Sequence, residues 1–211
     1  MNNIMIIGAG RAGRFTNSLA TLCNKKVIGF LDDTFTLGDS VDDVNILGTT
    51  DDILTVYEKY NCNFLISITH MTKRSDLLNL INRNNIPLAS LIHPTVIQAP
   101  KSHIGKGCII QPYTTIQTGA IIEDNVLIEE RCSIGVDVIV GENTVITPGV
   151  SLSGGVEVQP NCFIGTNSCV NPEIIISCNT TVGSGSTVVK TTEPDTVYAG
   201  SPAKLLKYKT K

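Results

Sequence analysis

Aliphatic residues recur at every sixth position along the second half of the chain. The fifteen positions are Ile104, Ile110, Ile116, Ile122, Ile128, Ile134, Val140, Ile146, Leu152, Val158, Ile164, Val170, Ile176, Val182 and Val188. The position four residues after each carries only Cys, Thr, Ala, Val, Ser or Ile. This six-residue repeat is typical of a parallel β-helix, in which three hexads form one triangular coil and both positions point inward. The fourteen hexads between 104 and 187 therefore predict between four and five coils.

The first ninety residues instead show apolar runs that alternate with segments of helical periodicity. The pattern predicts strands at 5–10, 27–33, 63–68 and 87–92, and helices at 11–26, 51–60 and 75–85. Strands separated by helices form a parallel sheet, so we expect a small Rossmann-like α/β domain. The predicted domains are residues 1–92 and 93–211.

Composition narrows the class of protein. The 211 residues carry a formal charge of −3, 17% charged residues and no sustained basic stripe, which argues against nucleic-acid binding. We find neither the pattern of a secretory signal nor a run of membrane-spanning length, and we expect a cytoplasmic protein. The absence of Trp, with only five Phe and five Tyr, suits a narrow core of small and β-branched side chains.

The seven cysteines and three histidines show no metal-ligand spacing, so we predict neither a zinc site nor a disulfide framework. Cys108, Cys132 and Cys162 fall on the inward position of the repeat. We interpret them as core residues rather than as nucleophiles.

A glycine-rich segment follows the first predicted strand. Gly8, Gly10 and Gly13 stand in the order G-x-G-x-x-G at the start of a helix, and Asp32 and Asp33 end the next strand. Such loops direct backbone N–H groups at an anion, which favours a site for a nucleotide diphosphate-sugar. The alternative is a turn that needs glycine only for packing. About four strands are too few for a complete dinucleotide fold.

Two basic residues follow the third strand, at the edge where ligands of open parallel sheets bind. Either Lys73 or Arg74 could contact a phosphate. The alternative is that both belong to a solvated first turn of helix.

Several segments together resemble the bacterial nucleotide-sugar acetyltransferases, the group of sialic acid O-acetyltransferases and UDP-4-amino-sugar N-acetyltransferases. The segments are GAGRAGR at 8–14, GFLDD at 29–33, LIHPT at 91–95, the hexads, TPGVSLSGGV at 147–156, GSGSTVVK at 183–190 and VYAGSPAK at 197–204. The resemblance spans nearly the whole chain. It implies a left-handed β-helix, a homotrimer that binds acetyl-CoA between neighbouring helices, and an N-terminal domain that holds the nucleotide, without a metal.

The resemblance also assigns acetyl-CoA contacts to small residues near the C-terminus and in the PG segment. These are Gly155, Gly183, Ser184, Gly185, Gly200, Pro202 and Ala203. The distribution of charge supports this placement of acetyl-CoA. Between residues 107 and 189 the repeat carries eight acidic residues and one basic residue. The bases return at Lys190, Lys204, Lys207, Lys209 and Lys211. A basic rim could meet the phosphates of coenzyme A; the alternative is a solvated tail.

The catalytic histidine of the resembled family is missing. In that family a His–Asp/Glu pair stands twelve residues before the proline of the PG turn, which is Pro148 here, and the positions hold Val136 and Asp137. The companion His position is Val145. At eighteen residues per coil, Gly154 lies one layer from Val136, and its N–H is a candidate oxyanion donor, as the family also implies.

Three functions remain open. The first is an N-acetyltransferase for a nucleotide-linked amino sugar, in which Asp137, water or the departing thiolate takes the proton. The second is a sugar O-acetyltransferase, which we disfavour because a hydroxyl depends more on a base. The third is a binding or scaffold trimer without catalysis.

Overall fold

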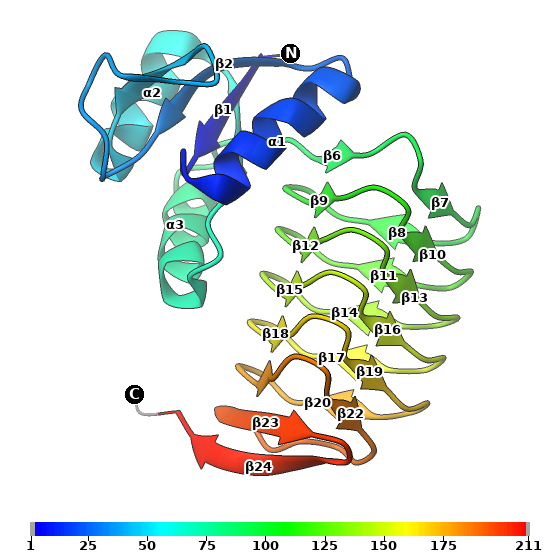
Figure 1. The fold of residues 1–211 in the computed structure, drawn as a ribbon. Coiled ribbons are helices and arrows are strands. Elements are labelled where there is room, and N and C mark those ends of the chain that lie inside the picture. The colour runs from blue at the N-terminus through cyan, green and yellow to red at the C-terminus, as the bar shows by residue number, and fades with distance from the viewer. Residues whose placement is uncertain (1–2, 210–211) are drawn as a thin grey trace. The chain divides into compact units, whose positions relative to one another are not determined.

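The structure, a computed structural model, describes residues 3–209 and divides into two compact units, one ending at Leu91 and the other beginning at Ile92 (Figure 1). The first unit is an α/β domain. The second is a triangular β-helix.

The first unit contains a five-stranded sheet in the order β3-β4-β2-β1-β5. Its strands are β1 (Asn3–Ile7), β2 (Lys26–Leu31), β3 (Ser40–Val41), β4 (Val44–Gly48) and β5 (Asn63–Ile66). The helices are α1 (Arg11–Leu22), α2 (Ile53–Tyr60) and α3 (Met71–Arg83), with a 3-10 turn, η1 (Thr50–Asp52), before α2. β1, β2, β4 and β5 run parallel, and β3 forms an antiparallel hairpin with β4. The parallel sheet was predicted from the sequence.

Three details differ from the prediction. β4 was missed, because it belongs to a polar hairpin with the two-residue strand β3. The predicted strand at 87–92 is not a strand of this sheet: Leu88 makes one parallel bridge to Phe64, and Leu91–Ile92 forms β6, which pairs with β-helix strand β9. Helix α3 begins at Met71 rather than at Ser75, and the Nδ1 atom of His70 caps it by accepting from the Lys73 N–H at 3.4 Å.

The second unit stacks two-residue strands into three parallel sheets (Figure 1). The first contains β6 (Leu91–Ile92), β9 (Ile109–Ile110), β12 (Leu127–Ile128), β15 (Val145–Ile146), β18 (Phe163–Ile164) and β21 (Thr181–Val182), followed by β23 (Thr196–Gly200) and β24 (Ala203–Tyr208). The second contains β7 (Ile97–Gln98), β10 (Thr115–Ile116), β13 (Ser133–Ile134), β16 (Ser151–Leu152), β19 (Cys169–Val170) and β22 (Thr187–Val188). The third contains β8 (His103–Ile104), β11 (Ile121–Ile122), β14 (Ile139–Val140), β17 (Glu157–Val158) and β20 (Ile175–Ile176).

The register between coils is eighteen residues, as in the pairing of Thr115 with Ser133 and of Ser133 with Ser151. Fourteen of the fifteen predicted aliphatic positions, from Ile110 to Val188, are at most 1% exposed. The inward positions of the hexads were therefore predicted correctly. Cys108, Cys132 and Cys162 are buried in the same core, and burial raises the pKa of the Cys132 and Cys162 thiols to about 12. Thiols with so high a pKa are poor nucleophiles.

The antiparallel pair β23–β24 ends the β-helix and continues its first sheet beyond β21. Added strands of this kind cover the hydrogen-bonding edge of the last coil. None of the helices between residues 3 and 209 combines the length and the apolar character needed to cross a membrane.

Candidate functional site

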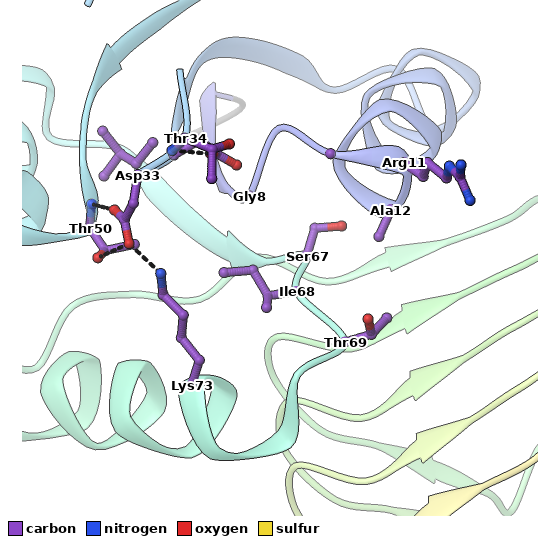
Figure 2. A pocket seen from close by; sticks show the side chains of 13 residues that line it. Gly8, Arg11, Ala12, Asp33, Thr34, Thr50, Ser67, Ile68, Thr69 and Lys73 are labelled. Carbon is purple, nitrogen blue, oxygen red and sulfur yellow. Dashed lines mark hydrogen bonds and ion pairs between the residues drawn. The ribbon is translucent and has the colours of Figure 1, made fainter. Parts of the chain in front are cut away.

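A pocket of 390 Å³ lies at the carboxyl ends of β1, β2 and β5 in the first unit (Figure 2). Loops after three strands and the beginnings of α1 and α3 contribute to it. Its lining residues are Gly8, Gly10, Arg11, Ala12, Leu31, Asp32, Asp33, Thr34, Thr50, Ser67, Ile68, Thr69 and Lys73. Thr50 and Ser67 were not predicted, and Ser67 lies inside the strand predicted at 63–68. Thr69 follows that strand and so carried the same positional signal as Lys73.

The three glycines of the loop have different roles. Gly8 has φ +100°, and a Cβ there would lie 2.8 Å from the Ser67 carbonyl oxygen. A Cβ on Gly13 would lie 2.0 Å from the Gly8 carbonyl oxygen, so this glycine allows α1 to pack against the loop. Gly10 has open space where its side chain would be, and it caps α1 without a side-chain hydrogen bond. Packing therefore explains Gly8 and Gly13, whereas Gly10 leaves the helix N-terminus open to the pocket.

The two aspartates at the end of β2 also differ. Asp32 accepts hydrogen bonds from the Ala9 N–H at 2.7 Å and from the Thr34 N–H and hydroxyl at 2.8 and 2.6 Å. Partial burial opposes its ionisation, but these hydrogen bonds outweigh burial and hold the pKa of Asp32 below its ordinary value. Asp32 thus ties the end of β2 to the glycine loop.

Asp33 faces the opposite side of the pocket, toward α3 (Figure 2). Its carboxylate accepts from the Thr50 N–H at 2.7 Å and from the Thr50 hydroxyl at 3.1 Å, and it forms an ion pair with Lys73. Burial by itself would raise the pKa of Asp33. The hydrogen bonds from Lys73 and Thr50 have the larger combined effect and hold this pKa below its ordinary value. Asp33 and Lys73 therefore present a fixed pair of opposite charges at the pocket wall.

The expectation that Arg74 could contact a phosphate is wrong in this structure. Arg74 is 1% exposed and does not line the pocket. Its Nη1 donates to the carbonyl oxygens of Ile66 and Ile68 at 3.1 and 3.0 Å. Successive residues of a helix point about 100° apart, so Lys73 can face the pocket while Arg74 enters the core and holds the loop that carries Ser67 and Ile68.

The second candidate site lies at one corner of the β-helix, between the second and third sheets. Here the Gly155 N–H donates to the Val136 carbonyl at 2.9 Å, and the Glu173 N–H donates to the Gly154 carbonyl at 3.1 Å. Val136, Gly154 and Pro172 therefore occupy one column in successive coils. Val136 is 43% exposed, so a side chain in the position of the missing histidine faces outward.

The Gly154 N–H has no hydrogen-bond partner within residues 3–209. This is a property of its place in the hexad, because the first residue of each turn directs its N–H away from the backbone of the next coil. Proline stands at the equivalent place in six hexads, at Pro94, Pro100, Pro112, Pro148, Pro160 and Pro172. Gly154 keeps an N–H at a place where the hexads with proline have none, as an oxyanion donor requires.

Acidic side chains of the neighbouring column fold toward the N-terminal end of the helix. A Cβ on Gly119 would lie 1.8 Å from Asp137 Oδ1, and a Cβ on Gly155 would lie 2.4 Å from Glu173 Oε1. Asp137 therefore stands over Gly119, in the coil before Val136, and not beside Gly154. The carboxylate beside Gly155 belongs to Glu173, which was not predicted, although its spacing of 36 residues from Asp137 places it in the same column.

The predicted acetyl-CoA residues gather at the C-terminal end of the β-helix. The Gly183 N–H donates to the Tyr198 carbonyl at 2.8 Å, and the Gly200 N–H donates to Ser186 Oγ at 3.1 Å. These bonds bring the segment Gly183–Ser184–Gly185 near the β23–β24 turn with Gly200, Pro202, Ala203 and Lys204. Gly155 lies apart from them, at a different corner of the β-helix and in an earlier coil.

The predicted basic rim is smaller than expected. Lys190, Lys204 and Lys207 are exposed. Lys209 instead donates to Asn179 Oδ1 at 3.0 Å, and burial lowers its pKa. Lys211 lies outside the described residues. Among residues 3–209, no group of three or more His, Cys, Asp or Glu side chains is arranged to hold a metal ion.

Family models match both units. The model of the PglD N-terminal domain matches residues 3–81, and that of the bacterial transferase hexapeptide (six repeats) matches residues 101–136. No curated protein sequence matches the chain.

Solved structures match over nearly the whole chain. The acetyltransferase domain of PglB from Neisseria gonorrhoeae is 25% identical, with 98% of this chain and 100% of that one covered and a TM-score of 0.91. The same domain in complex with acetyl coenzyme A is 26% identical over 97% and 99%, with a TM-score of 0.88. A mutant of perosamine N-acetyltransferase from Caulobacter crescentus, in complex with CoA and GDP-perosamine, is 24% identical over 98% of each chain, with a TM-score of 0.92.

The two matched domains, their order and the shared fold agree with the resemblance seen in the sequence. They identify the second unit as a left-handed β-helix of hexapeptide repeats, preceded by an α/β domain. The chain is therefore an acyltransferase that combines a PglD-type N-terminal domain with a hexapeptide-repeat domain, and it is similar over nearly its whole length to the acetyltransferase domain of PglB.

Proposed function

We propose that the protein transfers an acetyl group from acetyl-CoA to the amino group of a nucleotide-linked sugar, a 4-amino-4,6-dideoxy sugar of surface-glycan biosynthesis. The observation that carries this proposal is the corner at Val136 and Gly154, which has an unpaired N–H but no imidazole. A neutral amine is nucleophilic without a strong base, whereas a hydroxyl is not. The site therefore suits an amine acceptor better than a hydroxyl.

The nucleotide is proposed to bind in the pocket of the first unit. Gly10 leaves the first N–H groups of α1 open, and this positive helix end suits a diphosphate. Asp33 and Lys73 form the polar wall at which a base or ribose can donate to the carboxylate and accept from the ammonium. Gly8, Gly13 and Asp32 shape the glycine loop, and Arg74 holds the loop after β5 through the Ile66 and Ile68 carbonyls.

Acetyl-CoA is proposed to bind the β-helix, with its thioester carbonyl at the Gly154 N–H and the rest of the cofactor along Gly155, Gly183, Ser184 and Gly185. Gly185 has open space where a side chain would stand, which allows a thin ligand to approach the backbone. Gly200, Pro202, Ala203 and Lys204 complete this end. The complex of the PglB acetyltransferase domain with acetyl coenzyme A supports the choice of acyl donor.

A homotrimer is proposed from the third sheet. Its outward positions carry Ile121, Ile139 and Ile175, which are 40%, 37% and 36% exposed and lie in one column of paired strands, with Glu157 between them. An apolar column of this kind on a regular sheet suits burial against a second copy of the chain. Light scattering combined with size-exclusion chromatography measures the mass of the assembly directly. A monomeric protein at micromolar concentration would contradict the proposed homotrimer.

The central test is an acceptor screen. The intact protein is mixed with acetyl-CoA and with UDP-, dTDP-, GDP- or CMP-linked sugars, each as the amino sugar and as the matching hydroxyl sugar. We expect release of the CoA thiol, and an acetamide product by mass spectrometry, with an amino sugar only. Transfer to hydroxyl sugars would indicate an O-acetyltransferase. Binding of acetyl-CoA and a nucleotide sugar without any thiol release would indicate a non-catalytic trimer.

A further inference from the structure

The β-helix corner contains a carboxylate that the family pattern does not predict. The reaction proposed above produces a proton, because the attacking amine becomes an ammonium when its nitrogen bonds to the acetyl carbon. Val136 cannot accept this proton. Two nearby carboxylates could, those of Asp137 and Glu173, and they lie at different heights along the helix.

The height of each carboxylate follows from the glycine beneath it. Asp137 Oδ1 stands over Gly119, where an added Cβ would approach it to 1.8 Å. Glu173 stands over Gly155, where an added Cβ would lie 2.4 Å from Oε1 and 2.7 Å from Oε2. Gly119 and Gly155 are two coils apart, and coils are spaced by about 4.8 Å, so the two carboxylates lie roughly 10 Å apart along the axis.

The position of the oxyanion donor, the Gly154 N–H, decides between the carboxylates of Asp137 and Glu173. Gly154 is the chain neighbour of Gly155, so its free N–H lies in the layer over which the Glu173 carboxylate stands. An oxyanion about 3 Å from this N–H places the acetyl carbon and the attacking nitrogen within a few ångströms of residue 155. A carboxylate over Gly155 can reach that nitrogen. One over Gly119 stands on the far side of Val136.

The backbone conformation does not separate the two carboxylates. Glu173 and Asp137 have φ +60° and +55°, in the left-handed region, and Asn143 and Asn161 at the same place of other hexads have it too. The turn of each hexad requires this conformation, so the height of the carboxylate along the helix decides between Glu173 and Asp137.

We propose that Glu173, and not Asp137, is the catalytic proton acceptor; this assignment rests on the proposed N-acetyltransferase function. The amine nitrogen attacks the thioester carbonyl carbon while the Gly154 N–H stabilises the oxyanion. The ammonium proton passes to the Glu173 carboxylate, the C–S bond breaks, and the CoA thiolate leaves. The thiolate then takes the proton from Glu173, so that an amide and a free thiol are formed and the carboxylate is restored.

The test compares Glu173→Gln with Asp137→Asn in the full-length protein, using the nucleotide amino sugar that supports turnover in the acceptor screen. Glu142→Gln, an acid at a different corner of the same β-helix, is the control. We expect Glu173→Gln to lower kcat about 100-fold at pH 7, with the KM for acetyl-CoA changed less than about threefold. The loss should shrink as pH rises, because hydroxide and buffer bases then accept the proton.

Rescue separates proton transfer from a structural role. We expect formate to restore the kcat of Glu173→Ala by at least about tenfold, and to leave Glu142→Ala unchanged. A kcat for Glu173→Gln within threefold of the wild-type value, or a larger loss in Asp137→Asn, would overturn the assignment while the proposed function stands. A wild-type protein that releases no thiol with any amino sugar would overturn both.

Discussion

The N–H of Gly155 donates a hydrogen bond to the carbonyl oxygen of Val136 over 2.9 Å, which stacks the coil of Gly154 directly on the coil of Val136. The missing histidine and the oxyanion donor are therefore one layer apart. The chemistry of this corner depends on backbone atoms as much as on side chains, and backbone atoms can be tested by proline.

Gly154→Pro should remove the oxyanion donor without disturbing the turn. Its place in the hexad accepts proline in six other hexads, and the Gly154 N–H has no partner to lose among the described residues. We expect kcat to fall by about 100-fold or more, because one oxyanion donor contributes on that scale. Thr166→Pro, at the same place in another hexad, is the matched control and should retain activity. Equal loss in both variants would point to a distorted fold instead.

Replacement by Met should lower the stability of the first unit at Arg74 and the affinity for nucleotide at Lys73. Arg74→Met removes charge-assisted hydrogen bonds to the Ile66 and Ile68 carbonyls inside the protein, and we expect a loss of about 3 kcal/mol in the unfolding free energy of the first unit. Lys73→Met breaks an exposed ion pair and should cost less than about 1 kcal/mol.

Urea unfolding measures the stability of both variants, and isothermal titration with UDP, GDP, dTDP or CMP measures binding. We expect Lys73→Met to weaken nucleotide binding at least tenfold at unchanged stability. A stable Arg74→Met protein with wild-type hydrogen exchange in residues 67–70 would contradict the supporting role of Arg74.

Asp32 should make the first unit sensitive to acid. Its pKa in the folded protein is below the ordinary value of about 4, so its stabilisation is complete above that value and is lost as the pH falls through the folded pKa. Asp32→Asn should therefore be less stable than wild type at pH 7, and the two should converge as the pH falls through the folded pKa. Thermal melts across this range test the prediction, with exposed Asp43→Asn as the control. A constant difference at all pH values would exclude the carboxylate as the cause.

Glu129 should have the opposite dependence. Burial, and secondarily the charge of Glu130, raise its pKa to about 7, so folding favours its protonated form. Its unfavourable charge is absent below the unfolded pKa of about 4.3 and grows as the pH rises to about 7. We expect Glu129→Gln to melt at a higher temperature than wild type at pH 8 and at nearly the same temperature at pH 4.5. Exposed Glu58→Gln should show no such divergence.

Much of the molecule follows from the sequence alone, and the reason is periodicity. A repeat of six fixes which side chains of each hexad point inward, and three hexads per coil fix which residues share a column. Ile110 to Val188, the buried cysteines, and the columns of Val136 with Gly154 and of Asp137 with Gly155 were all accessible in this way. In the first unit, alternating strands and helices were sufficient for a parallel sheet, although β4, in its polar hairpin with β3, was not predicted.

Only the tertiary structure could decide between neighbouring residues. Asp32 and Asp33, and likewise Lys73 and Arg74, carry the same charge at adjacent positions, and only the packing of β2 and α3 separates them. Both aspartates line the pocket, but Asp32 binds the glycine loop and Asp33 pairs with Lys73, whereas Arg74 turns to backbone carbonyls in the core. In the β-helix, the repeat assigns Asp137 and Glu173 to one column but contains no information about which way along the axis a side chain folds. Gly119 and Gly155 leave space toward the N-terminal end, so each carboxylate lies one coil before its own backbone, and Glu173 rather than Asp137 stands beside Gly154.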